Sequence, residues 1–215
     1  MSFGAPFPAG RREVIYSFTA SDESASGSSS YSFTGLSFGA VDADRYVVAC
    51  LSWLGSGSVS SCTIGGVSAA IVIQSASALR NTAICIAKVP TGTTGTVAFS
   101  LSASATNAAV AVYRLVGIPS AAAASSATST ASNPTASLNV AKNGVAIGVA
   151  TAGAGSPPSA SWSGITEDCD NNYGSNQCRS SASQKFTTAQ TGLTVTCTFS
   201  TTAGSAGCFA VFEPA

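Results

Sequence analysis

The chain has 215 residues, a length that fits one domain or two small ones. Nine Lys and Arg residues balance nine Asp and Glu residues, and charged residues make up 8% of the chain, against about 25% in an average soluble protein. Such a chain lacks the basic surface that binding to nucleic acid or an anionic membrane requires. It contains no His, which excludes Ser-His-Asp and Cys-His catalysis and His-ligated metal sites. We therefore expect no nucleic-acid or membrane partner and no cofactor.

The chain begins with an apolar, proline-punctuated segment, residues 1–11, that precedes the first strand-like run. Its large apolar side chains and prolines are Phe3, Pro6, Phe7 and Pro8. One interpretation is a disordered terminus. The alternative is an arm that docks on a neighbouring protein, because exposed Phe side chains are costly. The segment lacks the basic and apolar stretches of a secretory signal, so we expect the chain to fold in a cytoplasm.

Short strand-like runs follow one another along the rest of the chain. Apolar and β-branched residues alternate with Ser and Thr inside the runs, and Gly-containing turns separate them. The predicted strands are residues 13–19, 31–38, 45–53, 60–64, 69–75, 82–89, 94–102, 108–115, 137–140, 145–151, 159–165, 180–187, 193–200 and 208–212. This pattern predicts an all-β fold, a jelly-roll-like antiparallel β-sandwich with an extended N-terminal arm.

Two polar segments of low complexity interrupt the strand pattern. Residues 21–30 read SDESASGSSS, which is typical of a mobile surface loop. Residues 120–132 are rich in Ala, Ser and Thr and have no apolar stripe, so we predict a connection that joins two parts of the fold.

The sequence repeats a strand pattern with a period near 100 residues. Residues 45–52 resemble 143–150, and residues 91–100 resemble 191–200. Two tandem six-stranded sandwiches would explain the repeat, as would one sandwich whose halves share a pattern. An isolated half with so few charges would expose aggregation-prone edges. We therefore predict one domain, residues 12–215, with similar halves at about 12–118 and 131–215.

Residues 165–179 are the most heterogeneous stretch of the chain. This stretch and the preceding strand supply aromatic, carboxylate and amide groups that are scarce elsewhere, namely Trp162, Glu167, Asp168, Asp170, Asn171, Asn172 and Tyr173. Amides and carboxylates hydrogen-bond sugar hydroxyls, and an aromatic ring stacks on a sugar face, so these groups suit a glycan site. The same oxygens suit a calcium ion, although no EF-hand spacing is present. The remaining interpretation is a long solvated loop.

Glycosidase chemistry needs two carboxylates about 5–10 Å apart across the sugar bond. Glu167 and Asp170 are the pair that this stretch offers, and nothing else in the sequence supports catalysis. We predict that the protein is not an enzyme.

Seven cysteines leave at least one thiol unpaired. Cys50, Cys62, Cys85, Cys197 and Cys208 lie in apolar runs and are predicted to be buried free thiols. The remaining two, Cys169 and Cys178, bracket a polar segment. A disulfide between them would close a long hairpin loop if the protein reaches an oxidising environment.

The order of the strand motifs resembles a known module. The motifs are residues 45–53, 62–69 (CTIGGVSA), 84–92 (ICIAKVPTG), 109–115 (AVAVYRL), 161–167 (SWSGITE) and 210–215 (AVFEPA). Together they resemble a jelly-roll-like β-sandwich found in virion proteins of tailed bacteriophages and gene transfer agents. The likeness covers about residues 12–215, and the seven cysteines are not part of that pattern.

The resemblance implies a non-enzymatic structural protein of a virion, and no catalytic residue carries over from it. The expected location is the capsid exterior, as a head spike or decoration, with a tail-fibre or tail-tip component as an alternative. The expected partners are other virion proteins, further copies of the chain and a host polysaccharide. A stand-alone carbohydrate-binding module is the alternative from another class of function.

Overall fold

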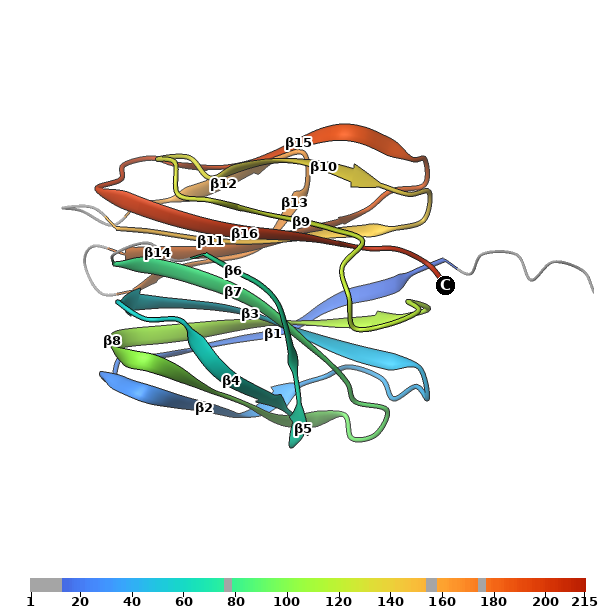
Figure 1. The fold of residues 1–215 in the computed structure, drawn as a ribbon, viewed down its shortest axis with the longest axis horizontal. Helices are drawn as coiled ribbons and strands as arrows, with labels where there is room; N and C mark the ends of the chain where they lie inside the picture. The colour runs from blue at the N-terminus through green and yellow to red at the C-terminus, as the bar shows by residue number, and fades with distance from the viewer. Residues whose placement is uncertain (1–12, 76–78, 154–157, 174–176) are drawn as a thin grey trace, which may run out of the picture.

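The computed structural model describes residues 13–75, 79–153, 158–173 and 177–215 (Figure 1). The described secondary structure consists of antiparallel β-strands, which confirms the predicted all-β class and sandwich character. The sheets stack as four layers, two from the first half of the chain and two from the second (Figure 1).

The first half contains eight strands. They are β1 (Ile15–Ser24), β2 (Ser28–Ser37), β3 (Arg45–Gly55), β4 (Val59–Ile64), β5 (Val67–Ser68), β6 (Ala70–Ser75), β7 (Arg80–Lys88) and β8 (Thr94–Val116). The long strand β8 belongs to both layers of this half. Its beginning pairs with β2 and β4 in an outer layer, and its end pairs with β1 and β3 in an inner layer. The resulting sheet is nearly closed and resembles a barrel.

The second half repeats this arrangement with separate sheets. Its strands are β9 (Ser125–Ser129), β10 (Thr135–Val140), β11 (Val145–Gly153), β12 (Ala160–Ser163), β13 (Thr166–Tyr173), β14 (Gln177–Lys185), β15 (Gln190–Phe199) and β16 (Gly204–Phe212). The inner sheet has the order β13-β14-β11-β16-β9, and the outer sheet has the order β10-β15-β12.

The two halves have the same strand order, except that β5 has no counterpart and β8 corresponds to both β15 and β16. The inner order β6-β7-β3-β8-β1 of the first half matches β13-β14-β11-β16-β9, and the outer order β2-β8-β4 matches β10-β15-β12. Even a β-bulge is shared: Val72 interrupts the β6–β7 register, and Asp168 interrupts the β13–β14 register at the matching place. The internal repeat of the sequence is therefore a repeat of strand topology.

The inner sheets are buried on both faces. One face of each packs on the outer sheet of its own half, and the other faces pack together to form the seam between the halves. The strands β7 and β11 are accordingly buried along almost their whole lengths. Burial on both faces explains why these segments are nearly continuous apolar runs, whereas the strand β10, with one solvent face, alternates.

Parts of the predicted loops are strands. Residues 21–24 and 28–30 extend β1 and β2, and the predicted connection 120–132 contains β9. Likewise the polar stretch 165–179 forms β13 and the start of β14. Of these strands, β1, β2, β9 and β13 lie at sheet edges, where one side of the ladder and much of the surface face water, so they need no apolar alternation.

Candidate functional site

The polar stretch identified in the sequence is a β-hairpin at the edge of the second half's inner sheet. Strand β13 pairs with β14, and the bulge at Asp168 lies between the pairs Glu167↔Ala182 and Cys169↔Ser181. A bulge places an extra residue in one strand and changes the direction of its side chains. Here Asp168 and Cys169 both reach the seam between the halves.

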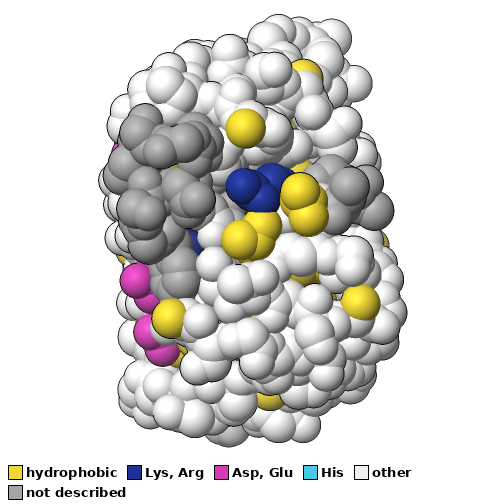
Figure 2. Space-filling model, turned by 90° about the vertical axis from the view of Figure 1, so that its left-hand side faces the viewer, with side chains coloured by type: hydrophobic (Ala, Val, Ile, Leu, Met, Phe, Trp, Pro, Cys, Tyr) yellow, Lys and Arg dark blue, Asp and Glu magenta, His cyan; other side chains and the backbone are white. Residues whose placement is uncertain are grey.

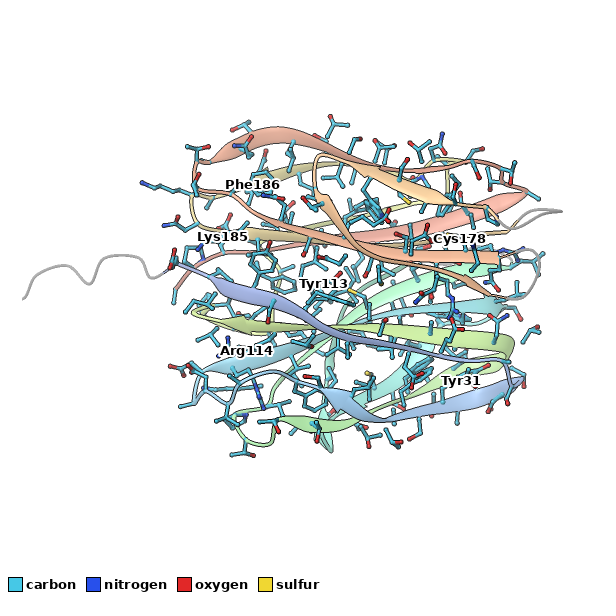
Figure 3. The ribbon with its side chains drawn as sticks, turned by 180° about the vertical axis from the view of Figure 1, so that it is seen from behind. Tyr31, Tyr113, Arg114, Cys178, Lys185 and Phe186 are labelled. Atoms are coloured by element: carbon cyan, nitrogen blue, oxygen red, sulfur yellow. The ribbon has the colours of Figure 1, made fainter. Side chains whose placement is uncertain are left out.

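Asp168 accepts hydrogen bonds from two sides of the seam. The Tyr113 hydroxyl of β8 donates to its carboxylate at 2.9 Å, and the Ser183 hydroxyl of β14 donates at 2.6 Å. The Tyr113 oxygen also lies 2.8 Å from Ser181 Oγ, and the ring of Phe18 packs edge-on against Tyr113 at 5.5 Å between centroids. Tyr113 is fully buried between the inner sheets (Figure 3). The carboxylate therefore links the two halves.

Burial controls the ionisation of this network. It raises the pKa of Asp168, and the hydrogen bonds from Ser183 and Tyr113 lower that pKa by a smaller amount. Burial also raises the pKa of the Tyr113 phenol well above its usual value. The Asp168 carboxyl group is thus shielded from water and held in position by the hydroxyl groups of Tyr113 and Ser183.

A small cavity lies beside this network. Its volume is about 20 Å³, which is room for one water molecule. Its lining comes from both halves and includes Asp22, Cys50, Ala111, Cys169, Arg179 and Ser181. Next to it, Arg179 forms an ion pair with Glu23 across the seam. The cavity is too small for a sugar ring.

Asp170 faces away from the seam, into the second half. Its carboxylate accepts from the Ala160 backbone N–H at 3.1 Å and from the Cys178 thiol at 2.8 Å. Asp168 and Asp170 thus serve different faces of one sheet. The Glu167 side chain is exposed, and partial burial raises its pKa, with smaller contributions from Asp170 and Asp168.

Trp162 is packed inside the second half. Its indole Nε1 donates to Ser180 Oγ at 2.7 Å, and its ring lies edge-on to Phe209 at 6.1 Å between centroids. The ring also covers Gly148, where a Cβ atom would lie 2.8 Å from it. The aromatic group predicted to stack on a sugar is half-buried against its own core.

The other predicted contact residues end up in different settings. Asn171 and Asn172 are exposed on β13, and the backbone of Tyr173 ends that strand opposite Gln177. Among the predicted contact residues whose side chains the structure describes, the exposed ones are therefore Glu167, Asn171 and Asn172. The predicted docking residues Phe3, Pro6, Phe7 and Pro8 lie outside the described residues.

The structure does not bring Cys169 and Cys178 together. Cys169 faces the seam, while Cys178 faces the core of the second half, so the intervening sheet separates them. All seven cysteines are free thiols, and the predicted burial of the other five is confirmed. Burial raises the pKa of the Cys208 thiol to about 12, which makes it a packing group and not a nucleophile at neutral pH.

Among the buried polar residues that sequence reasoning missed are Tyr113 and Arg45. Tyr113 has a strand pattern like that of its apolar neighbours, and its partner Asp168 is 55 positions away in the sequence. Arg45 is fully buried, and its guanidinium donates to backbone carbonyls of two loops, including Val89 at 2.7 Å and Gly92 at 2.6 Å. The sequence signal that could have identified Arg45 is a charged residue at the start of a strand, in a chain with few charges.

No cluster of three or more metal-ligating side chains occurs among the described residues. Within the same residues, no helix is long and apolar enough to cross a membrane. No family model matches the chain, and neither the curated proteins nor the solved structures contain a match. The functional argument therefore rests on the molecule itself.

Proposed function

We propose that the chain is a non-enzymatic structural protein of a virion, carried on the capsid exterior as a spike or decoration. The observation that carries this proposal is the internal use of the polar side chains. Asp168, Asp170 and Trp162 hydrogen-bond within the fold, as does the buried Arg45. These polar side chains hold the layers of the fold together, and this use of them supports a structural role.

The layered architecture also supports this role. Within the described residues, four stacked layers with two doubly buried sheets offer few locally unstable segments to proteases. The face at the left of Figure 1 is mostly uncharged, with isolated cationic and acidic side chains (Figure 2). Partners in the particle would be other virion proteins and further copies of the chain, with residues 1–11 as the docking arm.

A glycan contact, if the particle uses one, would involve the exposed part of the hairpin. Glu167, Asn171 and Asn172 present a carboxylate and two amides to solvent. Glycan-array binding of purified protein tests this contact. The triple substitution Glu167→Gln, Asn171→Ala, Asn172→Ala should abolish any signal, and an unchanged signal would place the contact elsewhere.

The decisive experiment is quantitative mass spectrometry of density-purified, nuclease-resistant particles from the producing strain. A fixed number of copies per particle is the expected result. That number separates a spike at the capsid vertices from an abundant decoration or a tail component. Absence from particles, with the protein present in the soluble lysate, would overturn the proposal and leave the stand-alone carbohydrate-binding module as the next function to test.

A further inference from the structure

The seam brings together equivalent strands of the two halves in a pseudo-two-fold arrangement that is closer at the edge where β6 and β7 face β16. The shared bulge aligns Cys85 with Ala182, and the strand registers then align Val48 with Ile147. In the first half one row across the inner sheet reads Ile86, Val48, Tyr113. The matching row in the second half reads Ser183, Ile147, Ala210. Two related sheets that pack through the same face form an isologous contact, as in a symmetric dimer.

The two edges of this seam have opposite chemistry. At the apolar edge, β6 and β7 of the first half lie against β16, with side chains Val72, Ile73, Ile84, Ile86 and Ala210. At the polar edge, β13 and β14 of the second half lie against β8. The residues at the equivalent positions are Asp168, Cys169, Ser181, Ser183 and Tyr113.

Comparison of the two edges of the seam shows which polar side chains are not required for packing. The apolar edge has aliphatic side chains at the equivalent positions, with a large residue facing smaller ones. Its strands lie closer together than those of the polar edge, and one buried contact there is polar, Thr82 Oγ1 to Cys208 Sγ at 3.2 Å. Ile84 and Ile86 lie on the side of Ala210, whereas Ser181 and Ser183 lie on the side of Tyr113. A hydrogen-bonded buried carboxylate at one edge is therefore an addition to a seam that packs well without it.

We infer that the polar edge is a pairing-specificity device, which makes each half bind its unlike partner in the chain and reject a copy of itself. Pairing of two second halves would place Asp168 opposite Ala210, a residue without a side-chain donor. Pairing of two first halves would place the Tyr113 hydroxyl against Ile84 and Ile86. The first wrong pairing would leave Asp168 with Ser183 as its remaining donor, and the second would bury the Tyr113 hydroxyl without a partner, so both are disfavoured. The native pairing satisfies both.

Specificity of this kind matters for a chain built from two similar units. An apolar seam alone would let halves of different molecules pair in any combination, and crowded copies would form open chains. The additional cross-seam ion pair of Arg179 with Glu23 lies at the same polar edge. Both polar contacts thus oppose the pairing of like halves from different copies of the chain.

The test uses the full chain with a protease recognition sequence inserted between Pro119 and Ser120, two exposed residues of the connection before β9. Cleavage of the folded protein gives two halves that are still assembled. The cut protein is held in urea at the midpoint of its unfolding transition, diluted, and examined by native mass spectrometry. Random pairing would give like and unlike pairs in a 1:2:1 ratio. We expect like pairs to be at least about tenfold rarer than that, a difference of about 1.4 kcal/mol.

A symmetrised variant supplies the matched comparison. Its substitutions copy the apolar edge onto the polar edge, and they are Tyr113→Ala, Asp168→Val, Cys169→Ile, Ser181→Ile and Ser183→Ile. We expect like pairs of second halves to appear in this variant. The control Ile86→Val weakens the apolar edge and should leave pairing exclusive. Statistical pairing in the cut wild type would overturn the inference even if the symmetrised variant fails to fold, and so would exclusive pairing in a folded symmetrised variant.

Discussion

Arg45 is the most deeply buried charge in the described part of the chain. Its guanidinium donates to carbonyls of the loop before β3, including Gly39 and Ala40, and of the loop after β7, including Thr91 and Gly92. Burial lowers the pKa of Arg45, and the nearby Arg114 adds to that effect. The five N–H donors of the planar guanidinium suit a cage of carbonyls in a way that an ammonium group does not.

We expect Arg45→Met to lower the free energy of unfolding by more than about 3 kcal/mol, because several buried carbonyls lose their donor at once. Arg45→Lys should lose most of the same stability, since one ammonium cannot reach both loops. Urea denaturation measures both effects. Lys88→Met is the control, because Lys88 pairs with Asp44 at an exposed site, where an ion pair contributes about 0–1 kcal/mol. Equal losses for Arg45→Met and Lys88→Met would refute the caging role.

The seam carboxylate gives stability an unusual dependence on pH. Because burial raises the pKa of Asp168 in the folded chain, the unfolded chain loses this proton first as pH rises. The contribution of Asp168 to stability is therefore complete below about pH 4, the ordinary pKa of an aspartate, and declines as pH rises through the higher folded pKa. Most paired carboxylates show the opposite trend.

Asp168→Asn removes this titration and keeps a side chain of the same shape. We expect the stability of the wild type relative to Asp168→Asn to be greater at pH 3 than at pH 7. Urea denaturation at unit steps between these values measures the difference. The exposed Asp44→Asn controls for general effects of charge. A relative stability of the wild type that increases with pH would contradict the assignment of burial as the dominant cause.

At the scale of whole elements, the sequence predicts where strands occur but not which face of each strand points to the seam. Strands such as β3 and β7 follow from their apolar residues, and the predicted runs overlap them closely. The sequence repeat, however, aligns residue 45 with 143, whereas the shared bulge aligns Val48 with Ile147, one residue further along. A shift of one residue exchanges the two faces of a strand, so the repeat predicts strand order but not which side chains meet at the seam.

For the polar hairpin, the sequence predicts the location of the polar residues but not which of them are internal. Its composition is that of a binding loop, and the same residues form edge strand β13 because β14 provides a ladder for its backbone. Which of its carboxylates is internal depends on the bulge at Asp168, and a bulge leaves no mark in a polar sequence. The candidate site could be located from composition, but its division into internal and exposed groups required the register.

The packing of β11 under Trp162 gives a prediction for an element. Because a Cβ atom at Gly148 would lie 2.8 Å from the indole ring, Gly148→Ala should destabilise the fold by about 1–3 kcal/mol. The clashing atoms belong to the six-membered ring of Trp162, so Trp162→Phe should relieve the clash. A double-mutant cycle by thermal unfolding measures the coupling. We expect the double variant to lose less stability than the sum of the single losses, and strict additivity would contradict this packing.

At the scale of the whole molecule, the stacked layers and the N-terminal segment have separable roles. Strand β1 begins at Ile15, and the described core uses residues from Val14 onward. Deletion of residues 1–10 should therefore leave the melting temperature of the purified protein unchanged within about 2 °C, since the described core begins at Val14. Under the proposed function it should abolish incorporation into particles, because it removes Phe3, Pro6, Phe7 and Pro8.

A finer pair of variants separates apolar docking from the mere presence of an arm. Phe3→Ser with Phe7→Ser removes large apolar side chains, whose burial contributes about 1.5–3 kcal/mol each. Phe3→Leu with Phe7→Leu keeps apolar groups at both positions. Quantitative mass spectrometry of particles should show loss of the Ser variant and retention of the Leu variant. Normal incorporation of the deleted chain would show that the copies attach through the folded layers, and attention would then move to the exposed outer sheets.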